Sequence, residues 1–278
     1  MLGVSEKAPS VAARASGSSF YFAMRILPQA QREAMFEIYA FCRAVDDIAD
    51  GGGSREQRIE GLADWRRRID ALYSGRVPEG LDGLSRAIDK FALRMDDFLA
   101  VIDGMEMDAV EDIRAPDFET LDLYCDRVAS AVGRLSVRVF GTGENEGIEL
   151  AYHLGRALQL TNILRDIDED AEIGRLYLPR EALHAAGIDT NDPSAVVADP
   201  RIGVACNVVV ERARHHFAKA NEVMAQCRRR AVRAPRIMGL AYGQVLEDTV
   251  ARGWALPRNR VSLSKSHLIG IALRHAFI

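Results

Sequence analysis

Two short acidic segments contain the side chains of this 278-residue chain that are best suited to chemistry. Asp46 and Asp50 stand four residues apart in the first segment, and Asp166 and Asp170 have the same spacing in the second. Residues four apart lie on one face of an α-helix, so each pair would bring two carboxylates together. Because like charges at this spacing repel by roughly 0.2–0.5 kcal/mol, a cation is expected between the members of each pair.

The ligand types indicate Mg²⁺, which is commonly held by one or two carboxylates together with substrate phosphates. The four cysteines are scattered, and the six histidines show no metal-binding spacing. Each acidic segment also carries an arginine, Arg43 or Arg165, that can donate two hydrogen bonds to a phosphate. Asn162 falls on the same helical face as Asp166. Two such patches facing each other would hold a diphosphate, although a single pair is more often a solvated surface.

A third segment, residues 124–133, places small side chains inside a helical run between the two acidic segments. Small residues allow neighbouring helices to pack closely, which is the simpler interpretation, or they leave room for a long apolar ligand. Six aromatic residues could line a tunnel for such a ligand, and each ring face would stabilise a carbocation by roughly 0.5–2 kcal/mol. They could equally be ordinary core residues: Phe20, Phe22, Tyr39, Tyr124, Tyr177 and Tyr242.

The composition is that of a soluble globular protein, with 48% hydrophobic and 27% charged residues. No run approaches the ~20 apolar residues that span a bilayer, and the first residues do not read as a secretory signal. Residues 1–19 are rich in Ser, Ala and Gly, which predicts a poorly ordered start. The scattered cysteines fit a reducing, cytoplasmic setting.

Charge is distributed unevenly along the chain. Residues 201–278 hold 14 Lys and Arg against 4 Asp and Glu, whereas residues 1–200 hold 22 against 36. A basic region can bind nucleic acid or anionic lipid, but it is most often a solvated helix face, and no DNA-binding motif accompanies this one. We therefore expect no nucleic-acid partner. The tail at 264–278 could lie on a membrane surface, although packing on the domain is the simpler expectation.

Apolar residues recur with helical spacing along nearly the whole chain, which predicts an all-α protein. Residues 20–278 are expected to form one domain, because no composition shift marks a linker. Ser54 and Gln57 form a capping-box pattern that predicts a helix start. The stretch from Gly174 to Pro200 is rich in turn residues. The expected helices cover 28–50, 54–72, 81–91, 95–108, 118–140, 146–170, 201–229 and 236–253.

Four motifs, at residues 39–50, 124–133, 159–170 and 174–179, resemble those of the squalene and phytoene synthase family, the head-to-head prenyl transferases. The similarity extends from Ser18 to about Trp254. It implies an all-α, single-domain isoprenoid synthase fold with a central cavity. It also implies an Mg²⁺-dependent prenyltransferase in which the metal is bound by Asp46, Asp50, Asp166 and Asp170, and diphosphate by Arg43 and Arg165 with support from Asn162.

The resemblance also assigns positions within the cavity. Tyr124 matches a tyrosine of the reaction centre, and Tyr39, Tyr177 and Tyr242 match other family cavity positions. The positions that would contact the prenyl chains are Ser19, Phe20, Val128, Ala129 and Gly133.

Within the family, residues 18–28 and 128–137 are most similar to bacterial enzymes of hopanoid pathways that make presqualene diphosphate. This implies a 1'-1 condensation of two farnesyl diphosphate molecules with release of diphosphate, followed by a separate squalene-forming enzyme. No nucleotide motif is present, so an NADPH-dependent step is not expected. The site of action would be the cytoplasm or the inner face of the membrane. Phytoene, dehydrosqualene or full squalene synthesis stays open, as do a class I terpene cyclase and a non-enzymatic helical binding protein.

Overall fold

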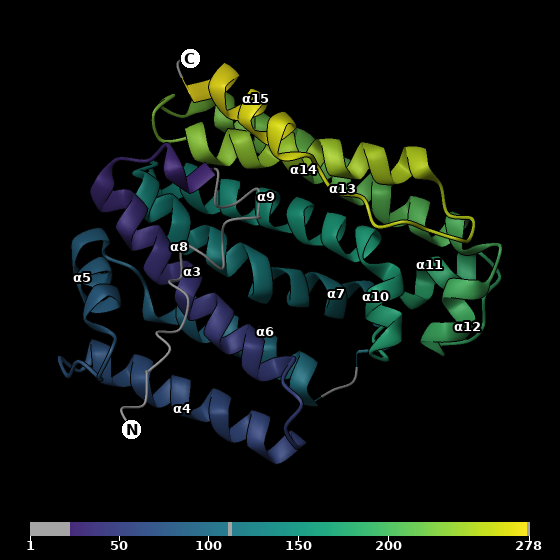
Figure 1. Ribbon diagram of the computed structural model, residues 1–278, viewed down its shortest axis with the longest axis horizontal. Coiled ribbons are helices and arrows are strands. Elements are labelled where there is room, and N and C mark those ends of the chain that lie inside the picture. The colour runs from purple at the N-terminus through teal and green to yellow at the C-terminus, as the bar shows by residue number, and fades with distance from the viewer. Residues whose placement is uncertain (1–22, 111–112, 277–278) are drawn as a thin grey trace, which may run out of the picture.

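Figure 1 shows the computed structural model, which describes residues 23–110 and 113–276. Within these two ranges the elements are helices, and one isolated parallel bridge joins Arg114 to Leu176. The all-α prediction is confirmed. The predicted poorly ordered start at 1–19 and the predicted substrate contacts Ser19 and Phe20 lie outside the described residues. No helix in the two ranges is both long and apolar enough to cross a membrane.

From Gln29 to Phe140, the described residues form six α-helices and a short π-helical segment, η1. They are α3 (Gln29–Ala49), α4 (Arg55–Tyr73), α5 (Asp82–Phe91), α6 (Met95–Val110), α7 (Phe118–Cys125), η1 (Asp126–Ser130) and α8 (Ala131–Phe140). The second half continues with α9 (Glu144–Arg165), α10 (Ile167–Glu172), α11 (Arg180–Ala185), α12 (Pro193–Ala198), α13 (Ile202–Gln226), α14 (Arg233–Arg252) and α15 (Lys265–Ala276).

Local signals in the sequence set several helix ends. The hydroxyl of Ser54 accepts from the backbone N–H of Gln57 at 3.3 Å, and the Gln57 side chain accepts from the Ser54 N–H at 2.8 Å. This is the predicted capping box, and it starts α4. Helix α3 begins after Pro28, which is its N-cap, one residue later than predicted. It ends at Asp50, just before three glycines, as expected.

Two helices that the sequence predicts to be continuous are interrupted. The predicted helix at 118–140 contains η1, where the backbone widens to a π-helical turn. The predicted helix at 146–170 breaks at Asp166, whose φ and ψ are −101° and 18°. The hydrogen bonds from Asp166 N to Asn162 O and from Asp170 N to Asp166 O, both 2.8 Å, persist across the break. The helical spacing therefore survives, which is why the sequence pattern does not reveal the break.

Helix α9 is central, with α8 and η1 packed on one side and α13 and α14 on the other (Figure 1). Glycines permit the closest contacts. A Cβ added at Gly155 of α9 would lie 2.7 Å from the Cα of Ser130, and one at Gly133 of α8 would lie 3.0 Å from the Cβ of Ala151. Ser130 and Gly133 of the segment 124–133 thus serve close helix packing, the simpler of the two interpretations offered for its small residues.

Candidate active site

The first acidic motif lies at the C-terminal end of α3. Arg43 Nη1 donates to Asp46 Oδ2 at 2.6 Å, and its Nη2 donates to Asp47 Oδ1 at 2.5 Å. Asp50 caps the helix and accepts from Arg175 Nη1 at 2.9 Å. Burial, and next the charge of Asp50, raises the pKa of Asp46 to about 6. Three carboxylates thus crowd one helix end that holds a single arginine of its own.

The second acidic motif lies where α9 passes into α10. Asp166 accepts two hydrogen bonds from Arg165, at 2.7 and 2.5 Å, and one from Arg260 Nε at 2.8 Å. Burial alone would raise the pKa of Asp166, but these hydrogen bonds hold it below its usual value. Burial, and next the charge of Asp166, raises the pKa of Asp170 to about 7. Arg165 and Arg260 therefore offset the negative charge of Asp166 much more than that of Asp170.

The structure brings the two acidic motifs together around one space. The ion pair between Asp50 and Arg175 joins the end of α3 to the loop directly after α10. The charge of Asp108 on α6 contributes to the raised pKa of both Asp46 and Asp170. Because such influence requires short separations, Asp108 of α6 lies near a carboxylate of each acidic motif.

Asp108 is a member of this group that the sequence analysis missed. It accepts hydrogen bonds from the hydroxyls of Tyr177, at 2.6 Å, and Tyr124, at 2.9 Å. The two rings stack with centroids 4.9 Å apart. Burial raises the pKa of Asp108, and Arg175 partly opposes that shift. Asp108 follows the buried Gly104 by one helical turn and stands between the buried Met107 and Ala109. A carboxylate among buried neighbours needs polar partners, and this was the signal that could have identified Asp108.

An apolar cavity opens beside these polar groups, among α3, η1, α8, α9 and α14. It encloses about 1000 Å³ of empty space, including its mouth. Six residues singled out in the sequence line it: Tyr39, Val128, Ala129, Gly133, Asn162 and Tyr242. Its far end is lined by Val137, Phe140 and Leu150. A pocket of this size that is mostly apolar with a few polar groups suits a hydrocarbon chain bearing a charged head.

Asn162 is placed at the polar side of this cavity. Its Oδ1 atom is buried without a hydrogen-bond partner. A buried amide oxygen without a partner costs free energy, so its presence beside a cavity indicates a position that a ligand or ion can satisfy.

The structure assigns two C-terminal arginines to the second acidic motif, whereas the sequence analysis treated the basic region as a solvated face. Arg258 donates to Asp168 and to the carbonyls of Trp254 and Val197, and only 1% of its side chain is exposed. This anchor places Arg260, two residues later, against Asp166. No local pattern could have revealed the contact, since it joins segments that are distant in the sequence.

Comparison with known proteins shows the family of this chain. The profile of the squalene/phytoene synthase family matches residues 13–267. The chain belongs to the squalene/phytoene synthase family. The resemblance stated from the sequence motifs is therefore confirmed.

Relatives within the family support the same assignment. The chain is 60% identical over 264 residues to a presqualene diphosphate synthase of Rhodopseudomonas palustris, and 55% identical over 264 residues to one of Sinorhizobium fredii. Each alignment covers 95% of both proteins. The crystal structure of a squalene synthase from Alicyclobacillus acidocaldarius superposes with a TM-score of 0.79 at 26% identity, covering 88% of this chain and 93% of that one. The predicted isoprenoid synthase fold is confirmed.

Proposed function

We propose that this protein joins two farnesyl diphosphate molecules head to head into presqualene diphosphate and releases diphosphate. The proposal rests on two features of the structure. An ion pair joins the end of α3 to the loop after α10, and an apolar cavity is lined by Tyr39 of α3 and Asn162 of α9, which lie seven and four residues before the first aspartate of each acidic motif. The identity to presqualene diphosphate synthases, 60% and 55%, supports this product over phytoene or dehydrosqualene.

In the proposed reaction, the C1–O bond of one molecule breaks and its electron pair leaves with the diphosphate. We propose that Arg43, Arg165 and Arg260, which here donate to Asp46 and Asp166, also donate to the departing oxygens. The double bond of the second molecule attacks the allylic cation, and loss of one proton closes a cyclopropane ring. The apolar walls exclude water, which would otherwise capture the cation as an alcohol.

Tyr124 and Tyr177 would contribute through their oxygens. Both hydroxyls donate to Asp108, and the two hydroxyl oxygens lie 3.3 Å apart. Burial, and next the charge of Asp108, raises the pKa of the Tyr177 hydroxyl, so both rings stay neutral. Neutral, electron-rich phenols stabilise a carbocation without reacting with it.

Mg²⁺ is the metal we propose for this site. Among residues 23–110 and 113–276, no three His, Cys, Asp or Glu side chains are already gathered tightly enough to hold a metal ion. The donor set nevertheless fits Mg²⁺, which takes one or two carboxylates and completes its shell with phosphate oxygens and water. Asp46, Asp50, Asp166 and Asp170 would hold it, and the unpartnered oxygen of Asn162 fits the same role. When bound, Mg²⁺ would offset charge on the leaving diphosphate.

The test is incubation of the purified protein with farnesyl diphosphate and Mg²⁺, with and without NADPH, followed by mass spectrometry of the products. We expect a C30 cyclopropyl diphosphate in both cases, and no turnover after chelation of the metal. A C15 hydrocarbon would instead identify a terpene cyclase. Squalene formed only with NADPH would identify the reductive enzyme. Preference for a C20 substrate would identify a phytoene synthase.

We propose cytoplasmic action with peripheral membrane contact, because the four cysteines are free thiols and the product joins a long apolar hydrocarbon to a charged head. The groove between α14 and α15 supports this location. It is lined in part by Leu240, Ile271, His267 and Arg274, a mixture of apolar and basic groups suited to anionic lipid. Cosedimentation with vesicles containing phosphatidylglycerol tests the contact. Binding that is unchanged after deletion of residues 264–278 would contradict it. We propose that a separate squalene-forming enzyme consumes the presqualene diphosphate.

A further inference from the structure

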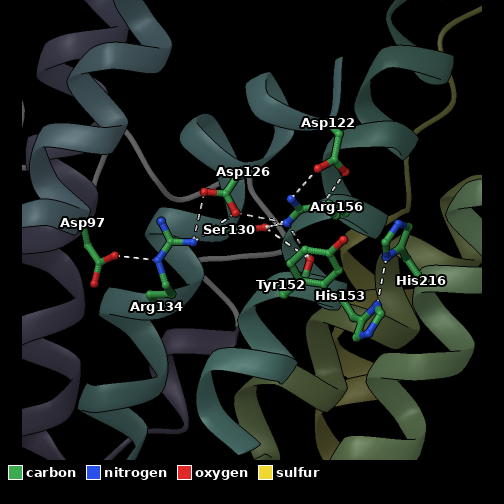
Figure 2. A network of polar contacts seen from close by, with 9 residues as sticks. All are labelled: Asp97, Asp122, Asp126, Ser130, Arg134, Tyr152, His153, Arg156 and His216. Atoms are coloured by element: carbon green, nitrogen blue, oxygen red, sulfur yellow. Dashed lines mark hydrogen bonds and ion pairs between the residues drawn. The ribbon is translucent and has the colours of Figure 1, made fainter. Parts of the chain in front are cut away.

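The cavity wall made by η1 and α8 is supported from behind by a ladder of ion pairs (Figure 2). Arg134 of α8 donates to Asp97 of α6 at 2.5 Å and to Asp126 of η1 at 3.1 Å. Arg156 of α9 donates to the same Asp126 at 3.1 Å and to both oxygens of Asp122 of α7, at 2.7 and 2.8 Å. The ladder therefore ties together all the helices around η1, and none of its members lines the cavity.

Arg156 makes the contacts that define η1. Only 4% of Arg156 is exposed, and its guanidinium also donates to the hydroxyl of Ser130 at 3.0 Å. Asp122 lies in the turn before η1, while Asp126 and Ser130 are the first and last residues of η1. Its guanidinium rests 3.6 Å from the centroid of the Tyr152 ring, which closes the other side. One planar guanidinium thus contacts the turn before η1 and both the first and the last residue of η1.

The same turn carries residues that face the cavity. Val128 and Ala129 lie within η1 and line the cavity, and Tyr124 comes two residues before it. A π-helical turn contains one residue more than an α-helical turn. If η1 became α-helical, the side chains before it would rotate about the helix axis relative to those after it. Gly155 leaves no space between α9 and Ser130, so a turn that changed shape could not remain in place.

An ionic ladder is a costly way to join helices. Apolar side chains of the same volume would often stabilise such a contact as well or better, because burying charges removes their hydration. What a forked guanidinium adds is a fixed geometry, since its donors have defined directions. The use of arginine and aspartate in the ladder therefore indicates that it fixes the relative positions of the helices more than it stabilises the fold.

We propose that Arg156 is a positioning residue, which holds η1 in its π-helical register and so fixes Val128, Ala129 and Tyr124 where the two prenyl chains meet. This inference rests on the proposed function. Its consequence is that Arg156 selects the outcome of the reaction, cyclopropane formation as opposed to escape or hydrolysis of the cation, without touching the substrate.

The test compares Arg156→Met, which keeps the length of the side chain, with Arg156→Lys, which keeps the charge but loses the fork. The matched control is Arg66→Met, because Arg66 joins α4 to Asp103 and Glu106 of α6 away from the cavity. The measurements are the product distribution from farnesyl diphosphate, kcat and KM separately, and amide hydrogen exchange of residues 126–130.

For Arg156→Met we expect kcat to fall at least about 10-fold with KM changed less than about 3-fold. We also expect a larger share of farnesol among the products, and about 10-fold faster exchange at 126–130. Arg156→Lys should be intermediate, and Arg66→Met should show none of these effects. The double variant Arg156→Met with Asp122→Leu should recover thermal stability, because no carboxylate is left without its partner, but not the product ratio.

Unchanged products and unchanged exchange in a folded Arg156 variant would overturn the proposal, and so would faster exchange with unchanged products. Recovery of the product ratio in the double variant would reduce Arg156 to a structural role and overturn it as well. Failure of the proposed function is distinguishable, since the unaltered protein would then not make the C30 cyclopropyl diphosphate. In that case the exchange measurement still decides whether Arg156 holds η1.

Discussion

Arg175 Nη1 lies 2.9 Å from Asp50 Oδ1, so the loop after α10 contacts the last acidic residue of α3 directly. The side chain of Arg175 is 15% exposed, whereas that of Asp50 is 52% exposed. The arginine is therefore held in place by its surroundings, and the carboxylate stands at the edge of the site. This pair links the end of the first acidic motif to the loop that follows the second, and it holds the carboxylate of Asp50 in one orientation.

Replacing Arg175 with Gln should lower kcat/KM for farnesyl diphosphate by roughly 10–100-fold, because a hydrogen bond to a charged group contributes about 1.5–3 kcal/mol. The measurement is steady-state release of diphosphate. Arg214→Gln is the control, since Arg214 makes an ion pair with Glu247 between α13 and α14 at the surface. Equal activity of the two variants would show that the link does not orient Asp50.

Replacing Asp108 with Asn should lower kcat by about 100–1000-fold, a range typical of losing one preorganised electrostatic group. The amide keeps the shape but loses the charge, and its NH2 group cannot accept, so one of the Tyr124 and Tyr177 hydroxyls loses its acceptor. Circular dichroism should remain unchanged. Asp103→Asn on the same helix, which only loses an ion pair with Arg66, should retain activity within about 3-fold. An active Asp108→Asn variant would remove Asp108 from the reaction centre.

Sequence reasoning succeeds here where the deciding interaction is local. The spacing of Asp46 and Asp50 is a property of one helical turn, and the capping box joins Ser54 to Gln57, three positions later. Both could be identified from type and spacing alone. The motif resemblance then supplied the fold and the relation between the two acidic segments.

It fails where the partner comes from elsewhere in the chain. The importance of Asp108 depends on Tyr124 and Tyr177, and that of Arg260 depends on Asp166, and none of these neighbours is close in sequence. The π-helical turn is hidden for another reason. The apolar residues on both sides of it keep helical spacing, so a single extra residue does not disturb the pattern enough to be seen.

A pH dependence of stability follows from the contact between α9 and α13. The Nδ1 atoms of His153 and His216 are 3.0 Å apart, so one of them must be unprotonated and accept. Burial, and next the charge of His153, lowers the pKa of His216 from 6.5 to about 4. Between these values the unfolded chain binds a proton that the folded chain does not. The contribution to stability is therefore complete above pH ~6.5 and is lost as the pH falls toward 4.

His216→Gln should consequently lose less stability than the unaltered protein between pH 7.5 and pH 5, by urea unfolding at both values. Asp46 and Asp170, whose pKa values are raised, act in the opposite sense, because folding favours their protonated forms. They are present in both proteins, so the difference between the two isolates the histidine. His184→Gln, at an exposed histidine, should not alter the slope. Identical slopes for all three proteins would exclude the pair as a titrating element.

The length of the accepted prenyl chain should depend on Phe140. This residue ends α8, 16 positions after Tyr124, and lines the cavity. At about 1.5 Å per helical residue, Phe140 lies roughly 18 Å along the wall from Val128, the first residue of η1 that lines the cavity, so it stands at the opposite end of that wall. Phe140→Leu should raise the ratio of kcat/KM for geranylgeranyl over farnesyl diphosphate by about 10-fold, since one larger side chain decides the available depth. Phe98→Leu, in the buried contact with Phe41, removes a comparable volume elsewhere and should leave the ratio unchanged. If both variants keep the ratio of the unaltered protein, the cavity is closed by a different residue.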